Sequence, residues 1–354
     1  MSNRIKPIIV ISKLLQAFLL ASIAVTGSPA QETYSESAPF ERKLPANKRD
    51  KDQVTSKPMP ASAAEPRSVV IPVSVFDRTG APVSKFSKAD FAVFVDGAAV
   101  EVEALEKPTS LPNVLLLLDM SPSAFKRIED IRRKAQEFAL ELPAGTKVMV
   151  AEFHSQMNVR SQLTDDRDEI VKAISNTKVG DGTSLYTAME TLSEKVLPTL
   201  RGKTVVVVFT DGVDTTSTSG TYRSSVLEIA SAEASIYPVY YDTSVDVNLR
   251  SARPRLDPFR FPPGSIPTRG IAGMSEREYE RGREYLEDLA AVTGGRLLPA
   301  SKFEAGMKSL AAELASKIYL RISIADVADS RRSIKVRINR PNLKVISRGA
   351  LLEK

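Results

Sequence analysis

The stretch VLLLLD at residues 114–119 decides the fold. An unbroken apolar run that ends in a carboxylate is typical of a strand buried on both faces of a parallel sheet. A helical pattern follows at 128–142, where apolar residues recur at intervals of three and four until Pro143. A second buried strand is predicted for TVVVVF at 204–209. The alternation of strands and helices predicts an α/β fold with a doubly wound, mostly parallel sheet over residues 111–318.

On both sides of this region the pattern changes to short alternating strands. Apolar residues occupy every second position at 69–75 and again at 320–324, which predicts half-buried strands. Each flank alone offers too few short strands for a stable sheet. We therefore expect the β-rich flanks, 67–110 and 319–354, to form one small β-sandwich-like domain into which the α/β domain is inserted.

The first 30 residues have the pattern of a secretory signal peptide. Arg4 and Lys6 give a positive N-terminal region, an apolar segment follows at 14–25, and small residues at 28–30 mark a cleavage position. Residues 31–66 contain many Pro, Ala, Ser, Lys and Glu residues without an apolar period, which predicts a disordered linker. We expect an exported protein, periplasmic or extracellular. It would be tied to the membrane only if the segment at 8–25, which contains a lysine, stays uncleaved.

The composition excludes several kinds of chemistry. The chain of 354 residues has no cysteine and one histidine, so disulfides, thiolate metal sites, cysteine nucleophiles and a two-histidine metal site within one chain are ruled out. Lys and Arg total 49 against 43 Asp and Glu, a net charge of +6. That excess is too small to indicate a nucleic-acid partner. The side chains that remain for chemistry are the oxygen donors Asp, Glu, Ser and Thr.

One segment interrupts the α/β pattern. Residues 245–277 contain five prolines and six arginines and show no apolar period. A long segment of this kind predicts a Pro/Arg-rich loop insert. A solvated loop and a docking surface are both compatible with this composition.

Three polar loops follow predicted strands or open a predicted helix. They are DMSPS at 119–123, GDGTS at 180–184 and TDG at 210–212. Ligands of an open parallel sheet bind beyond the carboxyl ends of its strands, so we expect the three loops to meet there. The oxygen donors that they would bring together are Asp119, Ser121, Ser123, Thr183 and Asp211. Such carboxylates and hydroxyls suit a hard cation, Mg²⁺ or Mn²⁺.

The order of these residues also resembles a known family. The pattern D-x-S-x-S, a threonine about sixty residues later and an aspartate after the next central strand resembles the von Willebrand factor type A domain with its metal-ion-dependent adhesion site. The resemblance implies a Rossmann-like fold. It also implies that Ser121, Ser123 and Thr183 contact the metal directly. Asp119 and Asp211 would then act mainly through water molecules.

The flanking motifs are similar to those of the bacterial exported VWFA-related domain family. They are VSVFDRTGAPVSKFSKADFAVFVDG before the core, DGTSLYTAM and FTDGVDTTS within it, and IKVRINRPNLKVISRG after it. The resemblance covers roughly residues 68–350. The chain departs from the family pattern at Pro122, where glycine is usual, and in its shortened C-terminal tail. Proline fixes φ and removes an N–H, so a loop that needed this amide would bind metal less well.

The single residues also have structural interpretations. Asp119 or Asp211 alone could cap a helix or accept loop amides. We interpret Ser184 as a helix cap, Asp181 and Asp214 as solvated loop carboxylates, and His154 as a loop residue without a partner ligand.

Three functions compete on this evidence. The leading hypothesis is a non-enzymatic protein-binding module, whose divalent metal ion accepts an Asp or Glu carboxylate of a protein partner. The first alternative is a structural envelope protein with a degenerate metal site, for which Pro122 is the main argument. The second is a metal-dependent hydrolase, which would need a general base, and Asp181 and Asp214 are the candidates.

Overall fold

The structure is a computed structural model that describes residues 35–36, 66–244, 275–325 and 331–352. The predicted signal peptide, most of the predicted linker and most of the Pro/Arg-rich insert lie outside the described residues. Within the described part of the chain, no helix is both long enough and apolar enough to cross a bilayer.

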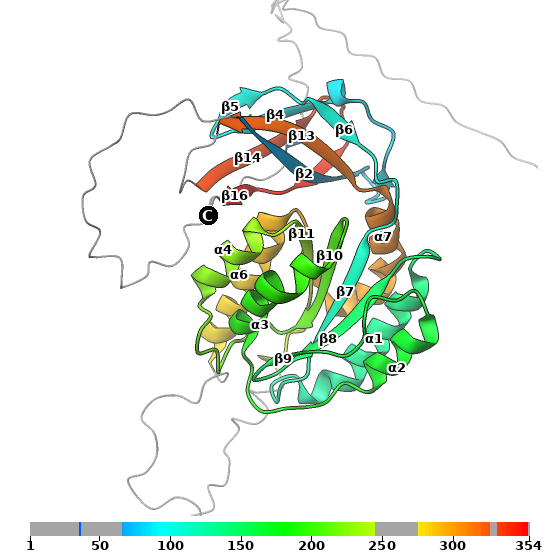
Figure 1. The fold of residues 1–354 in the computed structure, drawn as a ribbon, viewed down its shortest axis with the longest axis vertical. Coiled ribbons are helices and arrows are strands. Elements are labelled where there is room, and N and C mark those ends of the chain that lie inside the picture. The colour runs from blue at the N-terminus through cyan, green and yellow to red at the C-terminus, as the bar shows by residue number, and fades with distance from the viewer. Residues whose placement is uncertain (1–34, 37–65, 245–274, 326–330, 353–354) are drawn as a thin grey trace, which may run out of the picture. The chain divides into compact units, whose positions relative to one another are not determined.

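A six-stranded sheet forms the centre of the α/β domain (Figure 1). Its order is β12 (Leu298–Pro299), β11 (Ala234–Tyr240), β10 (Thr204–Thr210), β7 (Asn113–Asp119), β8 (Val148–Phe153) and β9 (Met157–Val159). All neighbours are parallel except β9, which runs antiparallel to β8 at one edge. Every residue of β10, and every residue of β7 after Asn113, is buried. Burial on both faces explains why these two strands are continuous apolar runs.

Helices cover both faces of this sheet (Figure 1). One face carries α1 (Ile128–Glu141), α2 (Arg167–Ser175) and α7 (Phe303–Ser316), and the other carries α3 (Leu185–Thr191), α4 (Tyr222–Ser231) and α6 (Glu276–Thr293). Successive strand residues point to opposite faces, so Leu116 and Leu118 belong to the first core while Leu115 and Leu117 belong to the second. The predicted doubly wound α/β fold is confirmed.

Two further sheets, built from both flanks of the chain, form a β-sandwich. The first contains β15 (Lys344–Ser347), β2 (Pro66–Phe76), β13 (Ile318–Ala325) and β6 (Ala104–Glu106), with β3 (Pro82–Val83) beside β2. The second contains β1 (Ser35–Glu36), β14 (Arg331–Ile338), β4 (Phe91–Val95) and β5 (Ala98–Val100), with β16 (Ala350–Leu352) beside β14. Residues of both sheets, among them Ile71, Val93, Leu320 and Ile334, share one apolar core. In this structure the strands of the sandwich come from both flanks, and the α/β domain lies between them in the sequence.

Two local features differ from the expectations. The predicted linker contains a short strand, β1, whose two residues pair with Ile338 and Arg337 of β14. A two-residue edge strand needs only backbone hydrogen bonds, so no apolar period announces it. Helix α6 takes the last two residues of the predicted insert: Ser275 caps it by accepting from the amide of Glu278 at 3.3 Å, and the Glu278 carboxylate accepts from the amide of Ser275 at 3.0 Å.

The pairing of β2 with β13 joins the two flanks and can be tested. Leu320 lies in β13, is completely buried and pairs with Ile71. We expect Leu320→Ala to lower the free energy of unfolding by about 2–5 kcal/mol, because the truncation leaves a cavity between the sheets. Urea denaturation measures the loss. Leu140→Ala is the control, since Leu140 is 57% exposed. A loss no larger than that of the control would contradict a core shared by both flanks.

A buried polar network lies where α7 passes into β13. Lys317, between the two elements, donates from Nζ to the Tyr237 hydroxyl at 2.7 Å and to the Gly294 carbonyl at 2.7 Å. The Tyr237 hydroxyl donates to Oε1 of Glu313 at 2.7 Å, and Nε of Arg296 donates to Oε2 at 2.8 Å. The network attaches the end of α7 to β11 and to the turn after α6. Burial lowers the pKa of Lys317 to about 8.

This pKa predicts a pH dependence of stability. In the unfolded chain the pKa of lysine is about 10.4, so between about pH 8 and 10.5 the unfolded state binds more protons at this site than the folded state. Stability contributed by Lys317 therefore rises with pH in this window. Over this window we expect the unfolding free energy of the wild type to rise by up to about 3 kcal/mol relative to that of Lys317→Met, since one pKa unit corresponds to about 1.4 kcal/mol. Urea denaturation at each pH measures it. The exposed Lys302→Met should show no such trend, and parallel profiles for wild type and Lys317→Met would contradict the prediction.

Candidate metal centre

The three predicted loops lie at the carboxyl edge of the six-stranded sheet. Asp119 ends β7 and Asp211 follows β10, which is the neighbour of β7. The loop at 180–184 is joined to the loop at 119–123 because the amide of Gly180 donates to the Met120 carbonyl at 3.1 Å. Gly180 is required here, since a Cβ at this position would lie 2.3 Å from the ring of His154. The close contact with His154 thus favours glycine at position 180, where the loop at 180–184 meets the loop at 119–123.

Asp119 is completely buried and uses both of its oxygens. Oδ1 accepts from the amide of Ser121 at 3.0 Å, which closes the turn after β7. Oδ2 accepts from the hydroxyl of Thr210 at 2.7 Å. The hydroxyl of Thr210 in turn accepts from the amide of Gly212 at 3.0 Å. The carboxylate of Asp119 therefore links the first polar loop to the loop after β10.

Asp211 is held in the same way on the neighbouring strand. Oδ1 accepts from the amide of Val213 at 3.0 Å, and Oδ2 accepts from the hydroxyl of Thr243 at 2.7 Å. The hydroxyl of Ser123 also stabilises the charged form of this carboxylate, and it lies 3.0 Å from the hydroxyl of Ser121. These contacts gather Asp119, Ser121, Ser123 and Asp211 in one place.

The two carboxylates are electrostatically unfavourable as a pair. Burial, with repulsion from Asp211 as the next cause, raises the pKa of Asp119 to about 7. Burial also raises the pKa of Asp211, although the Val213 amide and the hydroxyls of Thr243 and Ser123 offset part of the shift. No basic side chain is among the main causes acting on either group. A divalent cation would offset both burial and repulsion, so an all-oxygen donor set of this charge fits Mg²⁺ or Mn²⁺.

Thr183 is the predicted donor with the least direct connection to the others. It is 1% exposed and its loop is held by backbone bonds: its amide donates to the Thr215 hydroxyl at 3.1 Å, and its carbonyl accepts from the amides of Thr215 and Thr216. Among the described residues, no hydrogen bond joins the Thr183 hydroxyl to Asp119 or Asp211. The backbone places Thr183 beside the other loops, and its role as a metal ligand stays a prediction.

Pro122 does not disturb the hydrogen bonds of its loop. The side chain is exposed, and the loop is held by the amide of Ser121 and by the hydroxyls of Ser121 and Ser123. None of these contacts uses an N–H at position 122. A proline is therefore compatible with the geometry that gathers the donors.

The neighbouring polar residues have structural contacts. Ser184 stands at the N-cap of α3 as predicted, but its hydroxyl contacts that of Thr216 at 2.8 Å and makes no cap bond. The cap is supplied by Asp214, whose Oδ2 accepts from the amide of Tyr186 at 3.0 Å. The prediction that Asp214 is a solvated loop carboxylate is thus wrong: burial raises its pKa. His154 accepts from the amide of Ser155 at 2.8 Å and lies against Gly180.

Sequence reasoning missed two threonines that hold the aspartates. Thr210 directly precedes Asp211, and Thr243 follows the end of β11. Both are completely buried, and both lie at the carboxyl ends of strands, where the rule for open parallel sheets places ligand sites. The position of Thr243 after a strand could therefore have marked it as a site residue. That its hydroxyl donates to Asp211 depends on the packing of β11 beside β10.

The bond from Thr243 to Asp211 predicts a stability effect. Thr243→Val keeps the shape of the side chain and removes the donor, which leaves Oδ2 of a buried carboxylate without this bond. We expect a loss of about 1–3 kcal/mol in the free energy of unfolding, measured by chemical denaturation with chelator present. Thr243→Ser should recover most of the loss because it restores the hydroxyl. Equal stability of Thr243→Val and wild type would contradict the bond.

Part of the α/β domain matches the model of a known family. Residues 114–213 match the family model of the von Willebrand factor type A domain. The matched region runs from β7 past the end of β10, so it contains Asp119, Ser121, Ser123, Thr183 and Asp211. The chain contains a von Willebrand factor type A domain. A comparison with curated proteins found no match.

Several solved structures are similar in fold. An aerotolerance-related membrane protein from Bacteroides fragilis, with multiple mutations to serines, is 14% identical, and the alignment covers 57% of this chain and 98% of that one with a TM-score of 0.41. A von Willebrand factor type A protein from Catenulispora acidiphila is 10% identical, with 82% and 74% covered and a TM-score of 0.39. The pilus adhesin SpaC from Lactobacillus rhamnosus GG, in its open conformation, is 10% identical, with 77% and 42% covered and a TM-score of 0.41. At these scores, none of the three similarities bears on function.

Proposed function

We propose that the protein is an exported protein-binding module that uses a divalent metal ion, Mg²⁺ or Mn²⁺, to hold an acidic side chain of a protein partner. The observation that carries the proposal is the pair of buried carboxylates, Asp119 and Asp211, with the hydroxyls of Ser121 and Ser123 beside them. Thr183 would complete the ligand set. The metal would supply the positive charge that this group of oxygens lacks.

A partner carboxylate is the ligand that suits such an ion. Two carboxylates and three hydroxyls leave at least one position of an octahedral shell open, so water or a further oxygen ligand would complete it. An Asp or Glu of a partner could take that position, since a carboxylate bound to a divalent ion is charge-assisted. Beside the loop, Phe125 is 61% exposed and Pro122 is exposed, so apolar surface is available next to the site.

A hydrolase is less well supported than a binding module. A metal-bound water would need a general base beside it. Asp214, one of the two candidates, is engaged with the amide of Tyr186 and with Ser217. Asp181, the other candidate, is exposed and has no hydrogen bond to a described side chain that would orient it. We therefore propose that the chain is not an enzyme.

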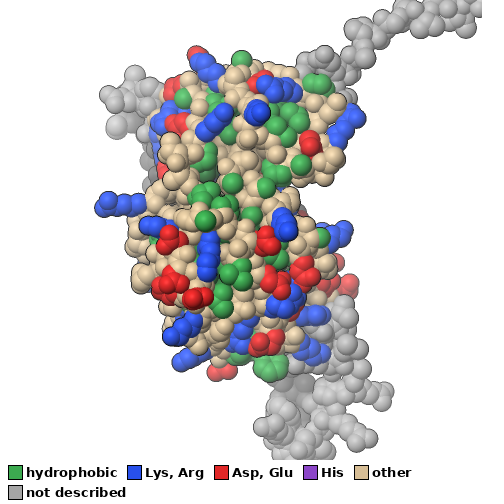
Figure 2. Space-filling model, turned by 90° about the vertical axis from the view of Figure 1, so that its right-hand side faces the viewer, with side chains coloured by type: hydrophobic (Ala, Val, Ile, Leu, Met, Phe, Trp, Pro, Cys, Tyr) green, Lys and Arg blue, Asp and Glu red, His purple; other side chains and the backbone are tan. Residues whose placement is uncertain are grey.

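A structural envelope protein with a degenerate metal site is the remaining alternative. Pro122 was its main argument, and the loop contacts do not need an amide at that position. Export rests on the signal-peptide pattern of residues 1–30. On the face of the molecule in Figure 2, acidic and basic side chains are interspersed over the α/β domain, and no continuous basic stripe is visible there. We therefore propose a protein partner and no nucleic acid.

Metal binding predicts a thermal shift. Mg²⁺ or Mn²⁺ at millimolar concentration should raise the melting temperature by several degrees, because only the folded state assembles the ligands. Asp119→Ala and Thr183→Ala should abolish the shift, and differential scanning fluorimetry with cation and with chelator measures it. Asp181→Asn is the matched control, an exposed carboxylate in the same loop as Thr183 that should keep the full shift.

The same variants test the partner. Immobilised wild-type protein should retain an acidic protein from an envelope extract with Mg²⁺ and release it with chelator, while Thr183→Ala should retain none. An equal melting temperature with cation and with chelator would favour the structural alternative. A melting-temperature shift with cation but no cation-dependent retention of a protein would contradict the binding function while still supporting the metal site.

A further inference from the structure

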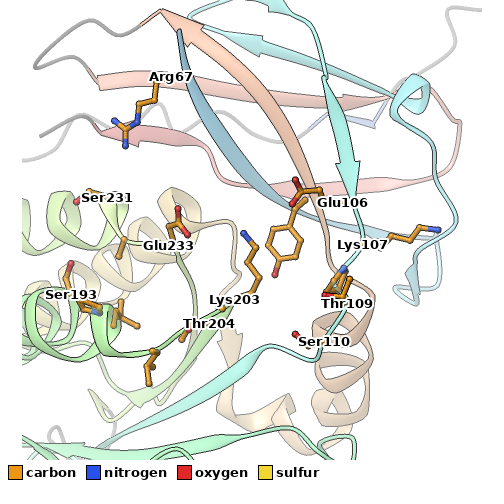
Figure 3. Close-up of a pocket in the computed structure, with 17 residues that line it drawn as sticks. Arg67, Glu106, Lys107, Thr109, Ser110, Ser193, Lys203, Thr204, Ser231 and Glu233 are labelled. Carbon is orange, nitrogen blue, oxygen red and sulfur yellow. The ribbon is translucent and has the colours of Figure 1, made fainter. Parts of the chain in front are cut away.

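A cleft lies at the edge of the six-stranded sheet opposite the metal centre. It is a cavity of about 970 Å³ between the β-sandwich and the start of β10, and the residues that line it include Lys203, Thr204, Arg67, Glu106 and Tyr319. An adjoining recess of about 110 Å³ shares Arg67, Lys203 and Tyr319 with it. Figure 3 shows Arg67 extending from the sandwich side, with Lys203 and Glu233 on the α/β side.

The recess contains a buried guanidinium that is only partly satisfied. Arg348, in the turn between β15 and β16, lines the recess and is 6% exposed. Its Nη2 donates to the Ala232 carbonyl at 2.7 Å. Its Nε has no hydrogen-bond partner. A buried N–H of a charged group without a partner costs free energy, so an anion brought next to the Arg348 guanidinium would be stabilising.

The other charged groups of the recess make it electropositive. Arg67, Lys203 and Arg348 face one carboxylate, that of Glu233. Nζ of Lys203 lies 4.7 Å from the centre of the Tyr319 ring, and none of the three basic groups has an ion pair with a described carboxylate. Glu233 partly offsets the burial that lowers the pKa of Arg348 to about 10. The surplus of positive charge favours an anion over a water molecule as the occupant of the recess.

We propose that this recess is a binding site for a small oxyanion, a carboxylate or a phosphate group, held by Arg348, Arg67 and Lys203. Arginine matches the planar arrangement of oxygens in either group, and the two flexible basic side chains add charge from both sides of the cleft. The recess of about 110 Å³ has room for such a group, since one water molecule occupies about 30 Å³ in the liquid. The site draws on the β-sandwich through Arg67 and Arg348 and on the α/β domain through Lys203, so its ligand would bridge the two.

The experiment uses inorganic phosphate and acetate as separate probes. The melting temperature of the full chain is measured against sodium chloride of matched ionic strength, with chelator present so that the metal centre takes no part. We expect a saturable rise with phosphate, with acetate or with both, and the probe that acts identifies the oxyanion. Phosphate also stabilises proteins by exclusion from their surface, so the decisive comparison is between variants.

Arg67→Gln and Lys203→Gln remove charge at positions that are not fully buried, and each should weaken the apparent affinity by about threefold to tenfold. The control is Lys107→Gln, which lines the outer cleft but not the recess and should bind as wild type does. Asp119→Ala should also bind as wild type, which separates this site from the proposed function. No saturable rise with either probe, or an equal rise in wild type and in both recess variants, would mean an adventitious ion only and would overturn the proposal.

Discussion

Backbone pairing between β7 and β10 is the constraint on which the α/β domain depends. The two strands pair in parallel from Asn113↔Thr204 to Leu118↔Phe209, and helices cover both of their faces. Parallel strands with this register end at the same edge, so Asp119 and Asp211 emerge beside each other. The same register places Thr210 next to Asp119, where its hydroxyl lies 2.7 Å from Oδ2. The geometry of the polar site follows from how the sheet is paired.

Placing two carboxylates in this position has an energetic consequence. Each is completely buried, and each is held by a loop amide and a threonine hydroxyl, Thr210 for Asp119 and Thr243 for Asp211. Hydrogen bonds offset the desolvation only in part, because the pKa of both groups stays raised. Removing charged groups from water is costly unless an opposite charge is added. The two threonine hydroxyls and the two loop amides therefore fix the orientation of the carboxylate oxygens, which a cation site at this position would require.

The insertion of one domain into another places polar groups at the junctions. The chain leaves the α/β domain through α7 and enters β13 at Lys317, whose ammonium group contacts Tyr237 and the Gly294 carbonyl. It returns to the α/β domain near its C-terminus, where Arg348 bonds the Ala232 carbonyl and the amide of Gly349 bonds the Ala291 carbonyl at 2.9 Å. Ala232 lines the cleft opposite the candidate metal centre, and Arg348 lines the recess that adjoins it. The electropositive recess lies where this C-terminal segment, with Arg348, packs against the α/β domain.

The sequence by itself determined the order of the main strands and helices, the β-rich character of both flanks and the loops that carry the polar site, because those depend on local periodicity and on where each strand ends. The apolar run at 114–118 and the polar residues directly after it are features of a few neighbouring residues. Tertiary structure decided which groups satisfy the carboxylates and which remain unpaired. Thr243 reaches Asp211 across 32 residues and Arg348 reaches Ala232 across 116. Likewise, Asp214 caps α3 in place of Ser184 because the loop after β10 packs against the start of that helix. Such pairings depend on the packing of distant segments, and no local pattern of residues specifies that packing.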